Sequence, residues 1–207
     1  MKKGKVDFGV AIYPPRAIRE AAKNLALLIE SKGVVLCSKI DATHIAHITV
    51  FQGGFPADPS NDIRSEIEES CDLNIEVKMQ TGLYLSSIGN IFWNAYVSPE
   101  LLGFHLEMIQ RIKPLTKGCF MEQWIDRLGD PAGLSKEARE MVIKNGFAAS
   151  GKLFMPHVTI GMLSDRSVWS EIKDIIVPQA SFTASQIIGG PLGYYGNIEK
   201  KSIVLGR

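Results

Sequence analysis

Two stretches of the chain, His47-Ile48-Thr49-Val50 and His157-Val158-Thr159-Ile160, carry the same order of histidine, aliphatic residue, threonine and aliphatic residue. The chain has four histidines and six threonines among 207 residues. A threonine therefore stands two positions after a given histidine by chance in about 3% of cases (6/207). Two matches among four histidines make coincidence a poor explanation, so we interpret the repeat as a functional motif.

Each stretch is typical of a β-strand, in which alternate side chains point to opposite faces. His47 and Thr49 then share one face, and the aliphatic residues occupy the other; His157 and Thr159 follow the same rule. A single strand of this kind is usually only a surface strand. If two related halves bring the two strands together, two imidazoles and two hydroxyls surround one cleft.

The pattern around the motifs predicts an α+β or α/β chain built from two related halves. A strand is expected over residues 6–12 and an amphipathic helix over residues 16–31. Further strands are expected over 34–36, 47–51, 73–79, 84–88, 91–97, 153–160, 182–188 and 203–205, and further helices over 61–71, 99–112, 135–145 and 168–176. Turns are expected at Thr81-Gly82 and in the glycine-rich segment 189–196.

Length and composition favour a single globular domain over residues 1–207, with 45% hydrophobic and 22% charged residues. Residues 115–151 have the weakest pattern, which predicts a mobile excursion or lid. A net charge of +1 excludes an extended basic face for long nucleic acid. Three cysteines without close spacing argue against a disulfide scaffold or a structural zinc site and fit the reducing cytoplasm. No apolar stretch approaches the roughly 20 residues of a membrane span.

Two imidazoles suit in-line displacement at phosphorus, because one can accept a proton from the nucleophile while the other donates a proton to the leaving oxygen. Both titrate near neutral pH. The threonine hydroxyls would hold the non-bridging oxygens where negative charge develops. This chemistry needs no metal and no cofactor.

With these motifs the chain resembles the two-histidine (2H) phosphoesterase superfamily, which includes LigT-like 2′-5′ RNA ligases and cyclic nucleotide phosphodiesterases. The resemblance rests on the opening strand Phe8-Gly9-Val10-Ala11-Ile12, on the spacing of the two motifs, and on Phe154-Met155-Pro156 directly before His157. It implies a bilobal fold with two pseudosymmetric halves, each with an antiparallel sheet and flanking helices, around a central cleft. It also implies that the catalytic residues are His47, Thr49, His157 and Thr159.

The chain departs from the superfamily at the position five residues after each histidine. Several members carry arginine or tyrosine there to hold phosphate, whereas this chain has Gln52 and Met162. Gln52 can still donate a hydrogen bond. Phe51 shares the predicted face of His47 and Thr49, so we expect it and Gln52 to contact the substrate.

Three weaker signals have simpler explanations. His44 precedes His47 by three residues, which on a strand would place the rings on opposite faces, so a metal site is disfavoured. His105 lies on the apolar stripe of a predicted helix and is expected to be a packed histidine. The glycine-rich segment 189–193 matches no nucleotide-binding motif.

We therefore predict a phosphodiesterase that hydrolyses a 2′,3′-cyclic phosphate or a 2′,5′-phosphodiester of a small nucleotide or short RNA. The expected protein is a monomer with no membrane partner and no metal. The alternatives are an RNA 2′-5′ ligase, a non-catalytic nucleotide or RNA-binding module on the same fold, and a metal-dependent phosphodiesterase. The sequence does not say which histidine is the acid.

Overall fold

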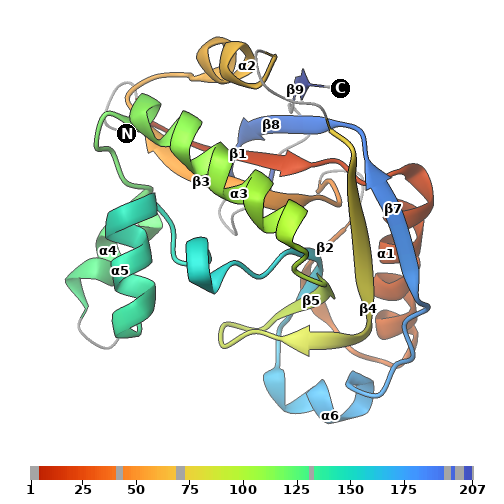
Figure 1. Cartoon of the computed structure of the whole chain (residues 1–207). Helices are drawn as coiled ribbons and strands as arrows, with labels where there is room; N and C mark the ends of the chain where they lie inside the picture. The colour runs from red at the N-terminus through yellow and green to blue at the C-terminus, as the bar shows by residue number, and fades with distance from the viewer. Residues whose placement is uncertain are drawn as a thin grey trace.

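The computed structural model describes residues 5–40, 44–68, 73–130, 133–193, 197–198 and 203–206. Its strands form one antiparallel sheet in the order β7-β4-β5-β6-β3-β1-β8-β9, with β2 beside β6 (Figure 1). The strands are β1 (Val6–Ile12), β2 (Leu36–Lys39), β3 (Ile48–Phe55), β4 (Ile75–Leu85), β5 (Asn90–Ala95), β6 (His157–Leu163), β7 (Ala180–Ala184), β8 (Ile187–Pro191) and β9 (Ile203–Gly206). The helices are α1 (Arg16–Ser31), α2 (Ser60–Glu68), α3 (Pro99–Ile112), α4 (Glu122–Gly129), α5 (Lys136–Asn145) and α6 (Trp169–Ile172), with short 3₁₀ turns η1 (Lys113–Thr116), η2 (Gly151–Leu153) and η3 (Arg166–Val168).

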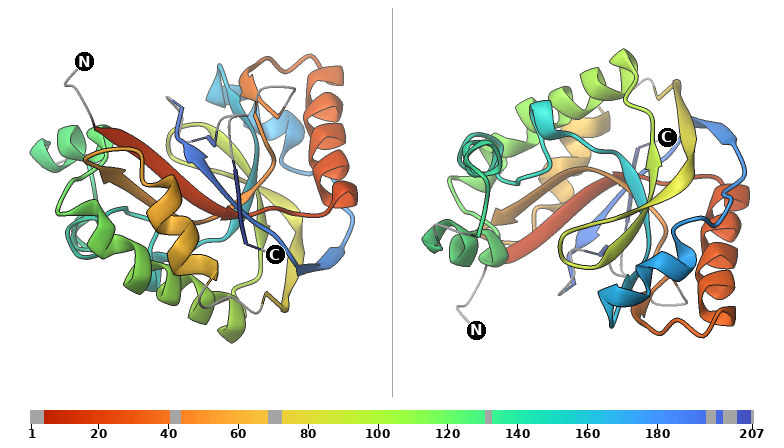
Figure 2. Two further views of the ribbon diagram at one scale, coloured as in Figure 1. Left: turned by 90° about the horizontal axis from the view of Figure 1, so that it is seen from above. Right: turned by 90° about the horizontal axis from the view of Figure 1, so that it is seen from below.

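The strand order is symmetric about the junction between β6 and β3. At this junction Ile48 pairs with Val158, and β5 flanks β6 as β1 flanks β3. Helix α1 follows β1 and packs against β6, whereas α3 follows β5 and packs against β3. Figure 2 shows α1 and α3 on opposite sides of the strands. The prediction of an α+β fold with two pseudosymmetric halves is confirmed.

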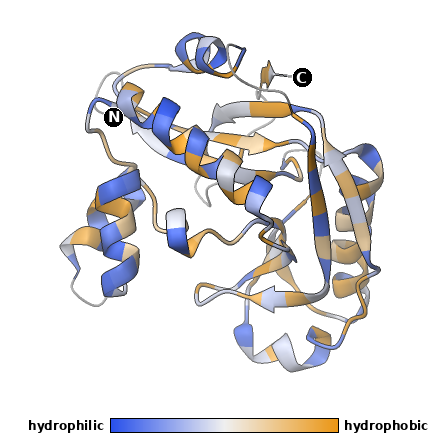
Figure 3. Ribbon diagram, viewed as in Figure 1, coloured by the Kyte–Doolittle hydropathy of each residue, from blue (hydrophilic) through white to orange (hydrophobic). Residues whose placement is uncertain are grey.

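Local sequence explains where the main helices begin and end. The Ser98 hydroxyl accepts a hydrogen bond from the Leu101 amide at 3.1 Å, and Ser135 does the same for Ala138. Gly146 ends α5 with a φ of 96°, a conformation that glycine adopts without steric cost. Figure 3 shows hydrophobic and hydrophilic residues mixed along the helices, and α1 and α3 pack against β6 and β3.

A β-bulge follows the threonine of each motif. In β3, Thr49 lies opposite Ala11 and Phe51 lies opposite Val10, so Val50 has no partner in β1. The second motif has the same irregularity. Thr159 and Gly161 in β6 pair with the consecutive residues Phe92 and Ile91 of β5, so Ile160 has no partner in β5. A bulge of one residue reverses the faces of all residues that follow it.

Several predicted boundaries are wrong for identifiable reasons. Thr81-Gly82 is not a turn, because β4 runs continuously through an irregularity in its pairing with β5. Gly189 and Gly190 lie in β8 beside β1, where a Cβ on Gly189 would stand 2.5 Å from the Leu205 side chain. Gly189 therefore serves close packing. The strand predicted at 34–36 lies at Leu36–Lys39 (β2), and the strand predicted at 153–160 begins only at His157 (β6). The helix predicted at 168–176 is shorter, at Trp169–Ile172. The helix predicted at 61–71 ends at Glu68, before residues that the structure does not describe.

No helix within the described ranges combines the length and apolar character needed to cross a membrane. Cys37 and Cys119 are free thiols. Cys71 lies outside the described residues.

Candidate active site

The two motifs meet at the junction of β3 and β6. Because Ile48 and Val158 are antiparallel partners, the register places His47 across from Thr159 and Thr49 across from His157. Ile48 and Val158 are fully buried on the core side. The alternation inferred from the sequence therefore holds through both motifs.

All four motif residues line one pocket of about 170 Å³, which we call the motif pocket. Its other described lining residues are Gln52, Ile88, Asn90, Phe92, Gln123, Trp124, Arg127, Phe147, Ala149, Phe154, Met155 and Asn197. None of these described residues is a carboxylate. The pocket is therefore suited to an anion.

Hydrogen bonds fix the orientation of both motif imidazoles. The Nδ1 of His47 lies 2.6 Å from the carbonyl oxygen of Ile45, and the Nδ1 of His157 lies 2.7 Å from that of Met155. Since a carbonyl oxygen only accepts, each Nδ1 must carry the proton and donate it. The Nε2 atom of each ring is therefore the nitrogen that exchanges protons.

Burial lowers the pKa of both motif histidines. His47 is 8% exposed, and desolvation moves its pKa below the usual 6.5. Desolvation also lowers the pKa of His157, to about 4, and the charge of the nearby His47 adds to this effect. At neutral pH both imidazoles are therefore mainly uncharged.

The His157 imidazole stacks on an aromatic ring, and no described residue makes such a contact with His47. The ring of Phe92 stacks on His157 with centroids 3.8 Å apart. Phe92 pairs with Thr159, and the equivalent position beside Thr49 is Ala11. The two halves therefore differ in how they hold their histidines.

The prediction that Phe51 shares the face of His47 and Thr49 is wrong. The bulge at Val50 turns Phe51 into the core, where it is fully buried and its ring lies 5.7 Å from that of Phe147. The same bulge brings Gln52 to the motif pocket. Gln52, five residues after His47, reaches the motif pocket because of this bulge.

His105 is a packed histidine, as expected. It is fully buried, its Nδ1 donates to the Val50 carbonyl at 2.8 Å, and its Nε2 accepts from the Gly151 amide at 2.9 Å. Its ring stacks on Phe154 at 3.9 Å. His105 thus connects the bulge of the first motif to the segment that leads into the second.

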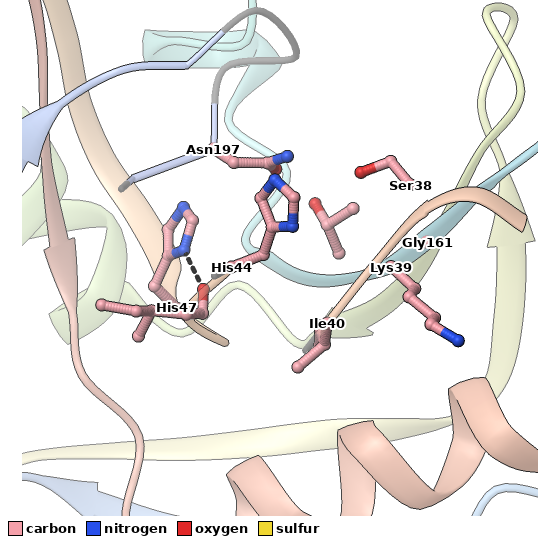
Figure 4. Close-up of a pocket in the computed structure, with 9 residues that line it drawn as sticks. Ser38, Lys39, Ile40, His44, His47, Gly161 and Asn197 are labelled. Carbon is pink, nitrogen blue, oxygen red and sulfur yellow. Dashed lines mark hydrogen bonds between the residues drawn. The ribbon is translucent and has the colours of Figure 1, made fainter. Parts of the chain in front are cut away.

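A second, small pocket shares His47, Thr159 and Asn197 with the motif pocket. Figure 4 shows His44, His47 and Asn197 around it. It has a volume of about 10 Å³, close to what one water molecule requires, and Ser38, His44 and Asn197 also line it. His44 and His47 therefore face the same pocket, contrary to the prediction, because the chain between them is not in a strand. Among the described residues, no cluster of three or more His, Cys, Asp or Glu side chains could hold a metal ion.

The contribution of α4 to the motif pocket was not predicted from the sequence. Gln123, Trp124 and Arg127 from this helix line the motif pocket. The spacing of three and four residues places them on one helical face. The weak pattern of residues 115–151 did not indicate which side of this helix faces the motifs.

Comparison with family models and with curated protein sequences gave no match. Solved structures do match in fold. Escherichia coli LigT complexed with 3′-AMP has a TM-score of 0.54 at 12% identity and covers 99% of this chain and 100% of its own. TT0787 of Thermus thermophilus has a TM-score of 0.52 at 14% identity, covering 96% and 97%, and Kluyveromyces marxianus Usb1 has a TM-score of 0.50 at 11% identity, covering 98% and 97%. The chain has the LigT-like fold that its motifs predicted.

Proposed function

We propose that this protein is a two-histidine phosphoesterase that hydrolyses a 2′,3′-cyclic phosphate or a 2′,5′-phosphodiester of a small nucleotide or short RNA, without a metal. The observation that carries the proposal is the symmetric pair of imidazoles, His47 and His157, which line one pocket with Nδ1 anchored and with no hydrogen bond to Nε2 from the part of the chain that the structure describes. The fold shared with Escherichia coli LigT, a protein described in complex with 3′-AMP, supports a nucleotide ligand.

The proposed reaction is one in-line displacement. One neutral imidazole takes a proton from water through Nε2, and the water oxygen forms a bond to phosphorus. The bond from phosphorus to the ribose oxygen breaks, and the other, protonated imidazole gives that oxygen its proton. Thr49 and Thr159 donate hydrogen bonds to the non-bridging oxygens. Which histidine acts as the acid follows from the orientation of the substrate.

The test is turnover in excess chelator of 2′,3′-cyclic AMP, 3′,5′-cyclic AMP and a 2′,5′-linked diadenylate, with products identified by chromatography. We expect one substrate to be hydrolysed by the wild type, and His47→Ala or His157→Ala to lose at least about 100-fold in rate. An unchanged rate in a folded His47→Ala variant would refute the mechanism. Activity that disappears with chelator and returns with a divalent cation would indicate a metal-dependent enzyme.

The threonines provide a second test with a matched control. Thr49→Val and Thr159→Val remove only the hydroxyl and should each lower kcat by about 10- to 100-fold. Thr183→Val, an exposed position on β7 outside the pocket, should leave kcat unchanged. Joining of RNA ends by the wild type would identify a ligase, and binding of 3′-AMP without any turnover would identify a non-catalytic module.

A further inference from the structure

The motif pocket opens into a larger groove. This outer groove has a volume of about 800 Å³ and shares four residues with the motif pocket: Ile88, Asn90, Gln123 and Arg127. The motif pocket, at about 170 Å³, is smaller than the roughly 300 Å³ at which pockets for ordinary small molecules begin. A nucleotide whose phosphate lies between the histidines extends beyond the motif pocket, and the outer groove is the cavity that shares residues with it.

Residues of helix α4 line both cavities. The Asp7 carboxylate on β1 accepts a hydrogen bond from the Glu122 amide at 3.2 Å, at the start of the helix. The backbone at Phe120 also approaches Gly54 of β3 so closely that a Cβ there would lie 2.5 Å from the Phe120 carbonyl oxygen. These two contacts hold the start of α4 beside β1 and β3.

Arg127 lines both cavities, whereas the carboxylates of Glu122 and Asp126 on α4 line only the outer groove. Arg127 is the only residue with a permanent charge among the described residues that line the motif pocket. Its guanidinium lies over the Trp124 ring, 5.1 Å from the centroid, and it forms no ion pair within the described part of the chain. The outer groove adds three carboxylates, those of Asp7, Glu122 and Asp126.

We propose that α4 selects the substrate by length: Arg127 binds a phosphoryl oxygen in the motif pocket, while Glu122 and Asp126 repel a further phosphate in the outer groove. This inference rests on the proposed function and narrows its substrate class. The substrate is then a single nucleotide or a dinucleotide with one phosphodiester, because its sugar and base can occupy the groove without a second negative charge. A continuing strand would bring phosphates beside the two carboxylates.

The positions five residues after the motif histidines supply no cationic donor for a phosphate group. Met162, five residues after His157, cannot donate a hydrogen bond to phosphate, and Gln52 carries no charge. A guanidinium provides charged donors whose planar geometry matches phosphate oxygens. Arg127 supplies the missing cation from a different element of the fold.

The experiment compares two substrates with the same reacting group, 2′,3′-cyclic AMP and a tetra-adenylate ending in a 2′,3′-cyclic phosphate. We expect kcat/KM of the wild type to be higher for the mononucleotide. The double variant Glu122→Gln/Asp126→Asn should raise kcat/KM for the tetramer by about 3- to 10-fold at low salt and change the mononucleotide value little. The control Glu171→Gln/Asp174→Asn neutralises the same two residue types outside both cavities and should change neither value.

Arg127→Gln should lower kcat/KM for both substrates by about 10- to 100-fold, with partial recovery in Arg127→Lys. Arg111→Gln on α3 is the matched control outside the pocket. Equal use of both substrates together with no effect of the double variant would overturn the length selection. An unaffected Arg127→Gln would overturn the phosphate contact.

A binding measurement separates this inference from the proposed function. If the wild type hydrolyses neither these two substrates nor the 2′,5′-linked diadenylate, the proposed function fails. Calorimetric titration with 3′-AMP and with an unreactive tetra-adenylate bearing a 3′-phosphate still tests the charge effects. Weaker binding of 3′-AMP by Arg127→Gln, and tighter binding of the tetramer by the double variant, would then support the inference. Unchanged affinities would refute it.

Discussion

Replacing His105 with phenylalanine should make the stability of the protein less sensitive to acid. Burial lowers the pKa of His105 from 6.5 to about 4, whereas the unfolded chain binds a proton near 6.5. Between these values the unfolded state binds more protons, so stability is fully present above about pH 6.5 and falls as the pH falls toward 4. A difference of 2.5 pKa units at 1.36 kcal/mol each gives about 3 kcal/mol over the whole window.

About 2 kcal/mol of this amount should be lost in the wild type by pH 4.5. At pH 7 His105→Phe should be less stable than the wild type by about 2 to 4 kcal/mol, because the Val50 carbonyl and the Gly151 amide lose their partners. His47 and His157 are present in both proteins, so their contributions cancel in the difference.

Urea unfolding at about pH 7 and pH 4.5 measures this difference directly. The deficit of His105→Phe should shrink by about 2 kcal/mol at the lower pH. His105→Gln, which also cannot titrate but keeps polar atoms, serves if the phenylalanine variant does not fold. The same deficit at both pH values would show that His105 does not carry the acid sensitivity.

Three further predictions concern the site and the sheet. The pH optimum of kcat/KM for 2′,3′-cyclic AMP should lie below 6.5, because one motif histidine must be protonated and burial lowers the pKa of both His47 and His157; an optimum above about 7.5 in a pH–rate profile would contradict this. Gly54→Ala should destabilise the protein by about 1 to 3 kcal/mol in urea titration, because its Cβ would meet the Phe120 backbone. Gly103→Ala, on an exposed turn of α3 with no atom within 4 Å of the new Cβ, should raise stability by up to about 1 kcal/mol in the same assay, and a loss would show that the position has a contact we do not see.

The sequence was informative where one face of an element is apolar and the pattern is regular. Helices α1 and α3 have the predicted bounds of residues 16–31 and 99–112, and the alternation in both motifs correctly separates His47 from Ile48. The prediction that the two motif strands meet depended only on a symmetry relation between the two halves. The pairing of Ile48 with Val158 supplies that relation.

The failures come from interactions between distant parts of the chain. Nothing near Val50 signals a bulge, since the register is set by β1, and alternation alone therefore placed Phe51 in the cleft. Gly189 resembled a turn residue until β8 was seen beside Phe8 and Leu205, where no side chain fits. Arg127 belongs to a short helix whose orientation depends on contacts with β1 and β3.

The electrostatics of the motif pocket link substrate binding to catalysis. Acid-base catalysis needs one protonated imidazole, yet burial keeps both His47 and His157 mainly uncharged at neutral pH. A phosphodiester carries a negative charge, and an anion within hydrogen-bonding distance raises the pKa of a histidine. Because two neighbouring imidazoles resist being charged together, the anion stabilises one proton on the pair rather than two. Under the proposed function, a bound phosphodiester therefore favours the protonated acid that its cleavage requires, whereas a neutral ligand of the same shape would leave the pair uncharged.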